Sequence, residues 1–71
     1  TQTTSALTDP LSVREEEVLQ LIAAQRSNQE IADTLIVSIN TVKTHIRRLY
    51  SKLGAGSRLE AVTRAQELGL L

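Results

Sequence analysis

Hydrophobic residues recur along this chain every three to four positions, which is the period of amphipathic α-helices. Four such stretches follow one another, and the short connections between them leave no room for a β-sheet. We therefore expect an all-α domain of four helices over residues 10–71, with a polar, non-periodic linker at residues 1–9.

Serine residues mark where three of the helices begin. Ser12, Ser27 and Ser57 are each followed three positions later by a glutamate. With this spacing the serine hydroxyl and the glutamate carboxylate can each accept a hydrogen bond from the other residue's backbone amide, a capping box. The helices are then expected to end near Ala24–Gln25, near Leu35 and, for the helix over residues 57–68, at Gly69.

The helix expected over residues 40–53, after a cap at Ser38, has two sharply different faces. Its apolar stripe consists of Val42, Ile46, Leu49, Tyr50 and Leu53. The opposite face carries Asn40, Lys43, Thr44, Arg47, Arg48 and Ser51, and one flank carries Thr41, His45 and Lys52. A core packed against the stripe would leave a cationic, hydrogen-bonding face open.

Composition removes several classes of function. The chain has 71 residues, no Cys and one aromatic residue, Tyr50, which excludes disulfide scaffolds, cysteine zinc sites and folds that stack single-stranded bases on aromatic rings. No nucleophile–base pair, glycine-rich phosphate loop or pair of carboxylates on one face is evident, so we expect neither an enzyme nor a cofactor. The absence of an initiator Met suggests a fragment.

Charge is unevenly distributed, although the net charge is zero. Residues 9–33 carry most of the acidic side chains, whereas residues 40–58 carry five basic ones, His45 and no acidic one. Such a local excess is typical of a nucleic-acid footprint, and a solvated helix face is the alternative. Together with the helix that precedes it, the helix over residues 40–53 forms the two-helix unit that can place its second helix in the major groove of DNA.

Four segments resemble the LuxR-type (GerE/FixJ-like) DNA-binding domain, in order and across residues 11–69. They are LSVREEEVL from Leu11, SNQEIA from Ser27, SINTVKTHIRRLYSKLG from Ser38 and SRLEAV from Ser57. The third segment is also similar to the C-terminal domains of large ATP-dependent activators of the MalT kind, and response regulators of the NarL/FixJ kind follow closely. The resemblance implies a four-helix helix-turn-helix bundle of a bacterial transcription regulator that binds double-stranded DNA as a homodimer in the cytoplasm.

The same resemblance implies roles for individual residues. Base edges would be contacted by Lys43, Thr44 and Arg47. Backbone phosphates would be contacted by Asn28, Ser38, Asn40, Thr41, Arg48, Lys52, Ser57 and Arg58. His45 has two open interpretations, a phosphate donor or a partly buried residue hydrogen-bonded to a neighbouring loop, and it lacks companions for a metal site.

The helix over residues 57–68 would form the dimer contact, with Glu60, Ala61, Arg64, Ala65 and Leu68 at or near the seam. The alternative is that its apolar residues cover the core, and both can hold on different faces. An upstream regulatory domain absent from this chain would control the domain, and RNA polymerase is a further partner to consider.

Three positions depart from the family pattern. Gln25 stands where glycine is frequent, which predicts a left-handed residue or a different helix end. Gly56 replaces a residue that is often polar or basic, and Ile39 is apolar near the groove end of the helix over residues 40–53. Two other functions stay open. A sigma-factor-like promoter-reading module has a similar helix-turn-helix pattern, but the capped helix over residues 57–68 argues against it. A small helical protein-interaction domain predicts an exposed apolar patch instead.

Overall fold

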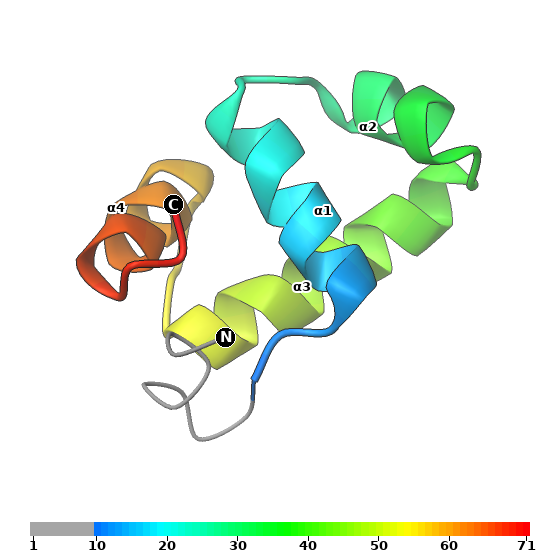
Figure 1. Cartoon of the computed structure of the whole chain (residues 1–71). Coiled ribbons are helices and arrows are strands. Elements are labelled where there is room, and N and C mark those ends of the chain that lie inside the picture. Colours follow the sequence, from blue (N-terminus) through cyan, green and yellow to red (C-terminus); the bar gives the residue numbers. More distant parts are fainter. Residues whose placement is uncertain (1–9) are drawn as a thin grey trace.

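The computed structural model describes residues 10–71, so the predicted linker at residues 1–9 lies outside the described residues. Within this range the chain forms four α-helices and no strand: α1 (Val13–Ala23), α2 (Asn28–Leu35), α3 (Ile39–Leu53) and α4 (Arg58–Glu67) (Figure 1). The all-α expectation is confirmed, and the predicted helix boundaries agree to within one or two residues.

The predicted caps begin the first three helices. Ser12 and Ser27 each form a complete capping box, in which the serine hydroxyl accepts from the glutamate amide and the glutamate carboxylate accepts from the serine amide. Ser38 caps α3 by accepting a hydrogen bond from the backbone N–H of Thr41 at 3.1 Å. These contacts satisfy amide groups that a helix leaves unpaired at its start.

The third predicted capping box is wrong in one of its two hydrogen bonds. The Ser57 hydroxyl accepts from the Glu60 amide at 3.2 Å, as expected, but the Glu60 carboxylate accepts from the backbone N–H of Gly56. The backbone of Ser57 is more extended than that of Ser12, with φ −155° against −74°. This rotation takes the Ser57 amide away from the Glu60 carboxylate and places the amide of the preceding residue, Gly56, against it.

All four helices end in the same way, with a left-handed residue followed by a backbone hydrogen bond that spans five residues. The bonds run from Arg26 to Leu21, Val37 to Ala32, Ala55 to Tyr50 and Leu70 to Ala65. The left-handed residues are Gln25, Ile36, Gly54 and Gly69, with φ between 58° and 77°. Of the two alternatives left open for Gln25, the left-handed conformation is the one observed. Ile36 was not anticipated, because β-branched residues rarely adopt this conformation.

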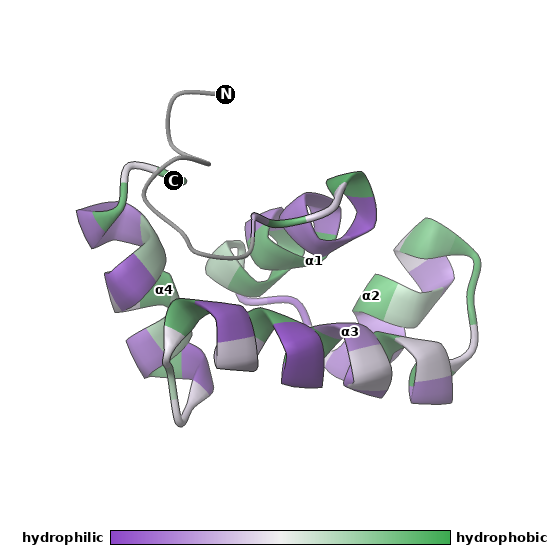
Figure 2. Cartoon of the chain, turned by 90° about the horizontal axis from the view of Figure 1, so that it is seen from below, coloured by the Kyte–Doolittle hydropathy of each residue, from purple (hydrophilic) through white to green (hydrophobic). Residues whose placement is uncertain are grey.

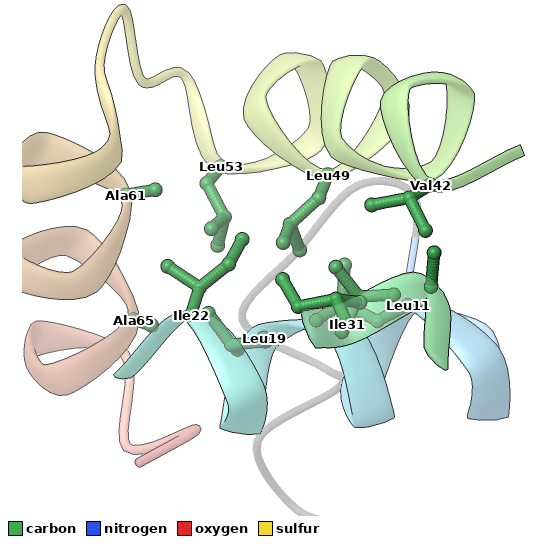
Figure 3. Packing of buried hydrophobic residues seen from close by; sticks show 11 residues of the cluster. Leu11, Leu19, Ile22, Ile31, Val42, Leu49, Leu53, Ala61 and Ala65 are labelled. Atoms are coloured by element: carbon green, nitrogen blue, oxygen red, sulfur yellow. The ribbon is translucent and has the colours of Figure 1, made fainter. Parts of the chain in front are cut away.

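Helix α3 is the centre of the packing, because it contacts each of the other three helices, whereas α2 and α4 meet only at their first residues, through a side-chain hydrogen bond between Asn28 and Arg58 within the described part of the chain. Figure 3 shows Val42, Leu49 and Leu53 of α3 pointing into the core, with Leu53 toward Ile22 of α1 and Val42 toward the end of the cluster that holds Leu11 and Ile31. The buried cluster draws on all four helices and comprises Leu11, Val18, Leu19, Ile22, Ile31, Ala32, Val42, Leu49, Leu53, Ala61 and Ala65.

Candidate nucleic-acid interface

The buried stripe of α3 determines which of its side chains remain exposed. Val42 and Leu49 have no exposed surface and Leu53 retains 2%. Because successive helical residues are rotated by about 100°, this leaves Asn40, Lys43, Arg47, Arg48 and Ser51 exposed on the other side. Bands of hydrophilic and hydrophobic residues accordingly alternate along α3 in Figure 2.

Basic side chains fall into two groups according to their partners. Arg14, Lys52, Arg58 and Arg64 form hydrogen bonds or ion pairs with other parts of the chain. Lys43, Arg47 and Arg48 of α3 form none with any group in residues 10–71, and neither does Arg26. The cations without internal partners are thus concentrated on the exposed face of α3.

Lys52 has a different role from the phosphate contact that the resemblance implies. Its Nζ atom lies 2.7 Å from Oε1 of Glu15 and 3.1 Å from the backbone oxygen of Pro10. Lys52 retains 17% of its side-chain exposure and Glu15 retains 4%. Lys52, which the resemblance assigns to a phosphate, is therefore a link between α3 and α1 in this structure.

The surroundings of Glu15 favour its charged form. Burial acts to raise the pKa of this carboxyl, but the hydrogen bond from Lys52, the hydrogen bonds with Ser12 and the charge of Lys52 outweigh burial and hold the pKa below its usual value. The ion pair is thus maintained at neutral pH with its carboxylate almost fully enclosed.

Arg58 joins α4 to the start of α2. One guanidinium nitrogen donates to the backbone oxygen of Arg26 and the other to Oδ1 of Asn28, both at 2.9 Å. Arg58 and Asn28, each expected to contact a phosphate, are brought together by a hydrogen bond to each other. The neighbouring Arg26 is exposed, and the sequence analysis did not include it among the candidate phosphate contacts. The signal that could have identified it is its position directly before the Ser27 cap.

Hydroxyl groups at the start of α3 are largely engaged within the helix. The Ser38 and Thr41 hydroxyls lie 2.9 Å apart, and the Thr44 hydroxyl donates to the backbone oxygen of Asn40 at 3.1 Å. Because the Thr44 hydroxyl is engaged, the methyl group is the part of this side chain that could contact a DNA base. Asn40 itself is exposed.

His45 is partly buried, as one interpretation required, but it lacks the predicted hydrogen bond to a loop. Its Nδ1 atom is shielded from solvent and has no hydrogen-bond partner among the described residues. No group of three or more potential metal-binding side chains occurs within residues 10–71.

Helix α4 corrects part of the expected dimer seam. Ala61 and Ala65 have no exposed surface because they pack into the core, so they offer nothing to a partner, and the core-covering alternative is right for both. Leu68 is half-buried against the same core. Arg64 donates from Nε to the backbone oxygen of Leu53 at 3.2 Å. By contrast, Leu59 is 77% exposed, and its helical spacing places Thr63 and Gln66 on the same outward side.

None of the helices formed by residues 10–71 has the length and apolar character that crossing a bilayer requires.

Three comparisons place this arrangement among known proteins. The chain is 54% identical over 61 residues to the HTH-type transcriptional regulator MalT of Serratia proteamaculans (strain 568), covering 86% of this chain and 7% of that protein. It is similar to the structure of the transcription factor GerE, with TM-score 0.80 and 36% identity over 86% of this chain and 91% of that one. It is also similar to a Vibrio cholera VqmA–ligand–DNA complex, with TM-score 0.79 and 37% identity over 84% of this chain and 26% of that one.

The chain thus spans a small part of the MalT and VqmA proteins and almost all of the GerE structure. A family model described as "Bacterial regulatory proteins, luxR family" matches residues 9–65, which is most of the chain. The four helices, the helix-turn-helix of α2 and α3 and these matches lead to one conclusion: the chain belongs to the LuxR family of bacterial transcription regulators and is its GerE-type helix-turn-helix DNA-binding domain.

Proposed function

We propose that α3 enters the major groove of double-stranded DNA and distinguishes base sequences there. The observation that carries this proposal is the group of exposed cations without internal partners on α3, opposite a face that is locked into the core. The major groove is about 12 Å wide and admits one helix. A helix fixed by its apolar stripe presents its polar face in one orientation, which sequence discrimination requires.

Lys43, Thr44 and Arg47 are the proposed base contacts. The amino group of Lys43 and the guanidinium of Arg47 are donors that match the O6 and N7 acceptors of guanine. The Thr44 methyl group suits contact with a thymine methyl, since its hydroxyl is engaged by Asn40. These residues lie within about one and a half helical turns of each other, a span that covers a few successive base pairs.

Phosphate contacts are proposed for residues that border this set. Arg48 and Asn40 are exposed on α3, and Arg26 is exposed before α2. Ser38 and Thr41 contribute from the start of α3, and Asn28, Ser57 and Arg58 from the linked starts of α2 and α4. Phosphate contacts fix the position of a protein on DNA without carrying sequence information. Lys52 is not included, because Glu15 engages it.

We further propose that two copies pair through the outward side of α4 when bound to DNA. Leu59 is the centre of this seam, with Thr63 and Gln66 beside it and Glu60 and Arg64 at its edge. An exposed leucine among small or uncharged side chains supplies the apolar contact that a weak dimer needs. Such a dimer would bind two half-sites about 10 bp apart.

The domain is proposed to act in the bacterial cytoplasm as one part of a longer regulator. The 7% share of the MalT relative that it spans supports this. An upstream regulatory domain would control its pairing, and activation of transcription would involve RNA polymerase. No catalytic role is proposed for the domain itself.

The test is a selection of binding sites from randomised duplexes, followed by titration of the selected and a scrambled duplex at low salt. We expect a preferred half-site, and we expect Arg47→Ala to lose about 1–3 kcal/mol of discrimination between the two duplexes. An equal loss on both duplexes would remove Arg47 from the base-contacting set. Absence of any complex at low salt would overturn the proposal as a whole.

A further inference from the structure

A surface depression lies between the start of α1 and the flank of α3. It is lined by six polar side chains: Ser12, Glu15, His45, Arg48, Ser51 and Lys52. Three of them already have partners, because Glu15 accepts hydrogen bonds from both Lys52 and Ser12. Arg48 has no partner among the described residues, and Nδ1 of His45 is buried without one.

We propose that His45 binds DNA as a neutral imidazole that carries its hydrogen on Nε2 and donates it to a backbone phosphate held beside Arg48. This inference rests on the proposed function and deepens it, because it assigns a tautomer and a contact to a residue whose interpretation was open.

The position of the hydrogen follows from the burial of one ring edge. A neutral imidazole has one N–H donor and one acceptor nitrogen. Nδ1 is shielded from solvent and meets no acceptor within residues 10–71, so a hydrogen placed there would be a buried donor without a partner. Unpaired buried N–H groups are rarer in proteins than underused acceptors. The hydrogen therefore belongs on Nε2, on the ring edge that is not enclosed.

The chemistry of the depression selects an anion as its ligand. Arg48 carries donors only, and Nε2–H of His45 adds another donor, while Lys52 is engaged by Glu15. The one carboxylate, Glu15, is almost fully enclosed and neutralised by Lys52. An anionic oxygen beside Arg48 would thus meet donors without meeting an uncompensated negative charge. Because α3 is the helix proposed to enter the groove, a DNA phosphate bordering that groove is the anion that reaches this flank.

The tautomer is tested first in the DNA-free protein, by ¹⁵N NMR of the imidazole at pH 8, where histidine is ordinarily neutral. We expect Nε2 to be the protonated nitrogen. On adding the selected duplex, the Nε2 resonance is expected to shift, whereas inorganic phosphate at the same concentration leaves it unchanged. A protonated Nδ1 would overturn the tautomer, and an equal response to inorganic phosphate would overturn the assignment to the DNA backbone.

Two matched variants test the contact itself. His45→Gln keeps an amide donor near the position of Nε2, whereas His45→Asn places its amide near Nδ1 and removes the outer donor. At pH 8 we expect His45→Gln to bind within about twofold of the unsubstituted chain, and His45→Asn to lose roughly fivefold on selected and scrambled duplexes alike. The reverse order of the two variants would overturn the proposal.

Salt dependence separates a neutral donor from a cation. The slope of log affinity against log salt concentration is expected to stay unchanged in His45→Gln and His45→Asn, because a neutral group releases no counterion. A slope reduced by about one in either variant would identify an imidazolium and overturn the inference. Thermal melts of both variants verify folding. If the unsubstituted chain binds no duplex, the proposed function fails, while the DNA-free NMR measurement still decides the tautomer.

Discussion

Nζ of Lys52 lies 2.7 Å from Oε1 of Glu15, and this contact joins the last turn of α3 to the first turn of α1. The same carboxylate completes the capping box of α1 through Ser12. One enclosed glutamate therefore both starts α1 and holds α3 in place.

Removal of Lys52 is expected to destabilise the domain. Lys52→Met leaves the Glu15 carboxylate buried without its counter-charge, which costs about 3 kcal/mol in enclosed ion pairs. The free energy of unfolding from urea titration provides the measurement. The double variant Glu15→Gln/Lys52→Met is the control, since it removes both charges and retains a capping side chain. It should be more stable than Lys52→Met, and the opposite order would show that the ion pair is not what Lys52 contributes.

Acid is expected to weaken the fold through the same carboxylate. Because the pKa of Glu15 is lowered in the folded chain, its contribution to stability is complete above the ordinary glutamate pKa of 4.5 and is lost as the pH falls through the lowered value. Urea unfolding at a series of pH values from neutral to about 3 measures this. Glu15→Gln should flatten the decline, and an equally steep decline in that variant would assign it to other groups.

Relief of the left-handed strain at Ile36 is expected to stabilise the turn between α2 and α3. Ile36 has φ 58° and is 90% exposed, so Ile36→Gly removes an unfavourable Cβ position without losing packing. The free energy of unfolding is expected to increase by about 0.5–1 kcal/mol, after subtraction of the cost of ordering the more flexible glycine. Ile36→Ala retains a Cβ and serves as the matched control. Thermal melts compare the two, and a less stable glycine variant would contradict the assignment of strain.

Two basic residues of α3 are expected to respond differently to salt. Arg48→Ala should reduce the slope of log affinity against log salt by about one unit, because a phosphate contact is lost. Lys52→Met should leave the slope unchanged, because Glu15 already engages that cation. Fluorescence anisotropy with one duplex at several salt concentrations measures both. Equal changes in the two slopes would return Lys52 to the phosphate contacts.

Pairing on DNA is expected to depend on Leu59. Leu59→Glu introduces a charge at an exposed position, so the monomer should remain folded while the complex with two copies on a two-half-site duplex is lost. Ala65→Glu provides the contrast, since a charge at a fully buried position should unfold the domain. Analytical ultracentrifugation gives the stoichiometry and circular dichroism the folding. Two copies of Leu59→Glu per duplex would place the seam elsewhere.

The sequence by itself determined the features that depend on neighbouring residues. The serine caps at Ser12, Ser27 and Ser38 and the left-handed Gln25 involve hydrogen bonds that span five residues or fewer. The two faces of α3 follow from the helical period alone. Such features are local, so residue type and spacing are sufficient to predict them.

Only the tertiary structure decided which polar groups find distant partners and which side of α4 is buried. Lys52 meets Glu15 across 37 residues, and Arg58 meets Asn28 across 30. Ala61 and Ala65 face the core while Leu59 faces outward, although the apolar pattern of this helix admitted either side. These outcomes depend on how the helices are placed relative to one another, because packing against α3 fixes which side chains come within hydrogen-bonding distance and which remain available for DNA.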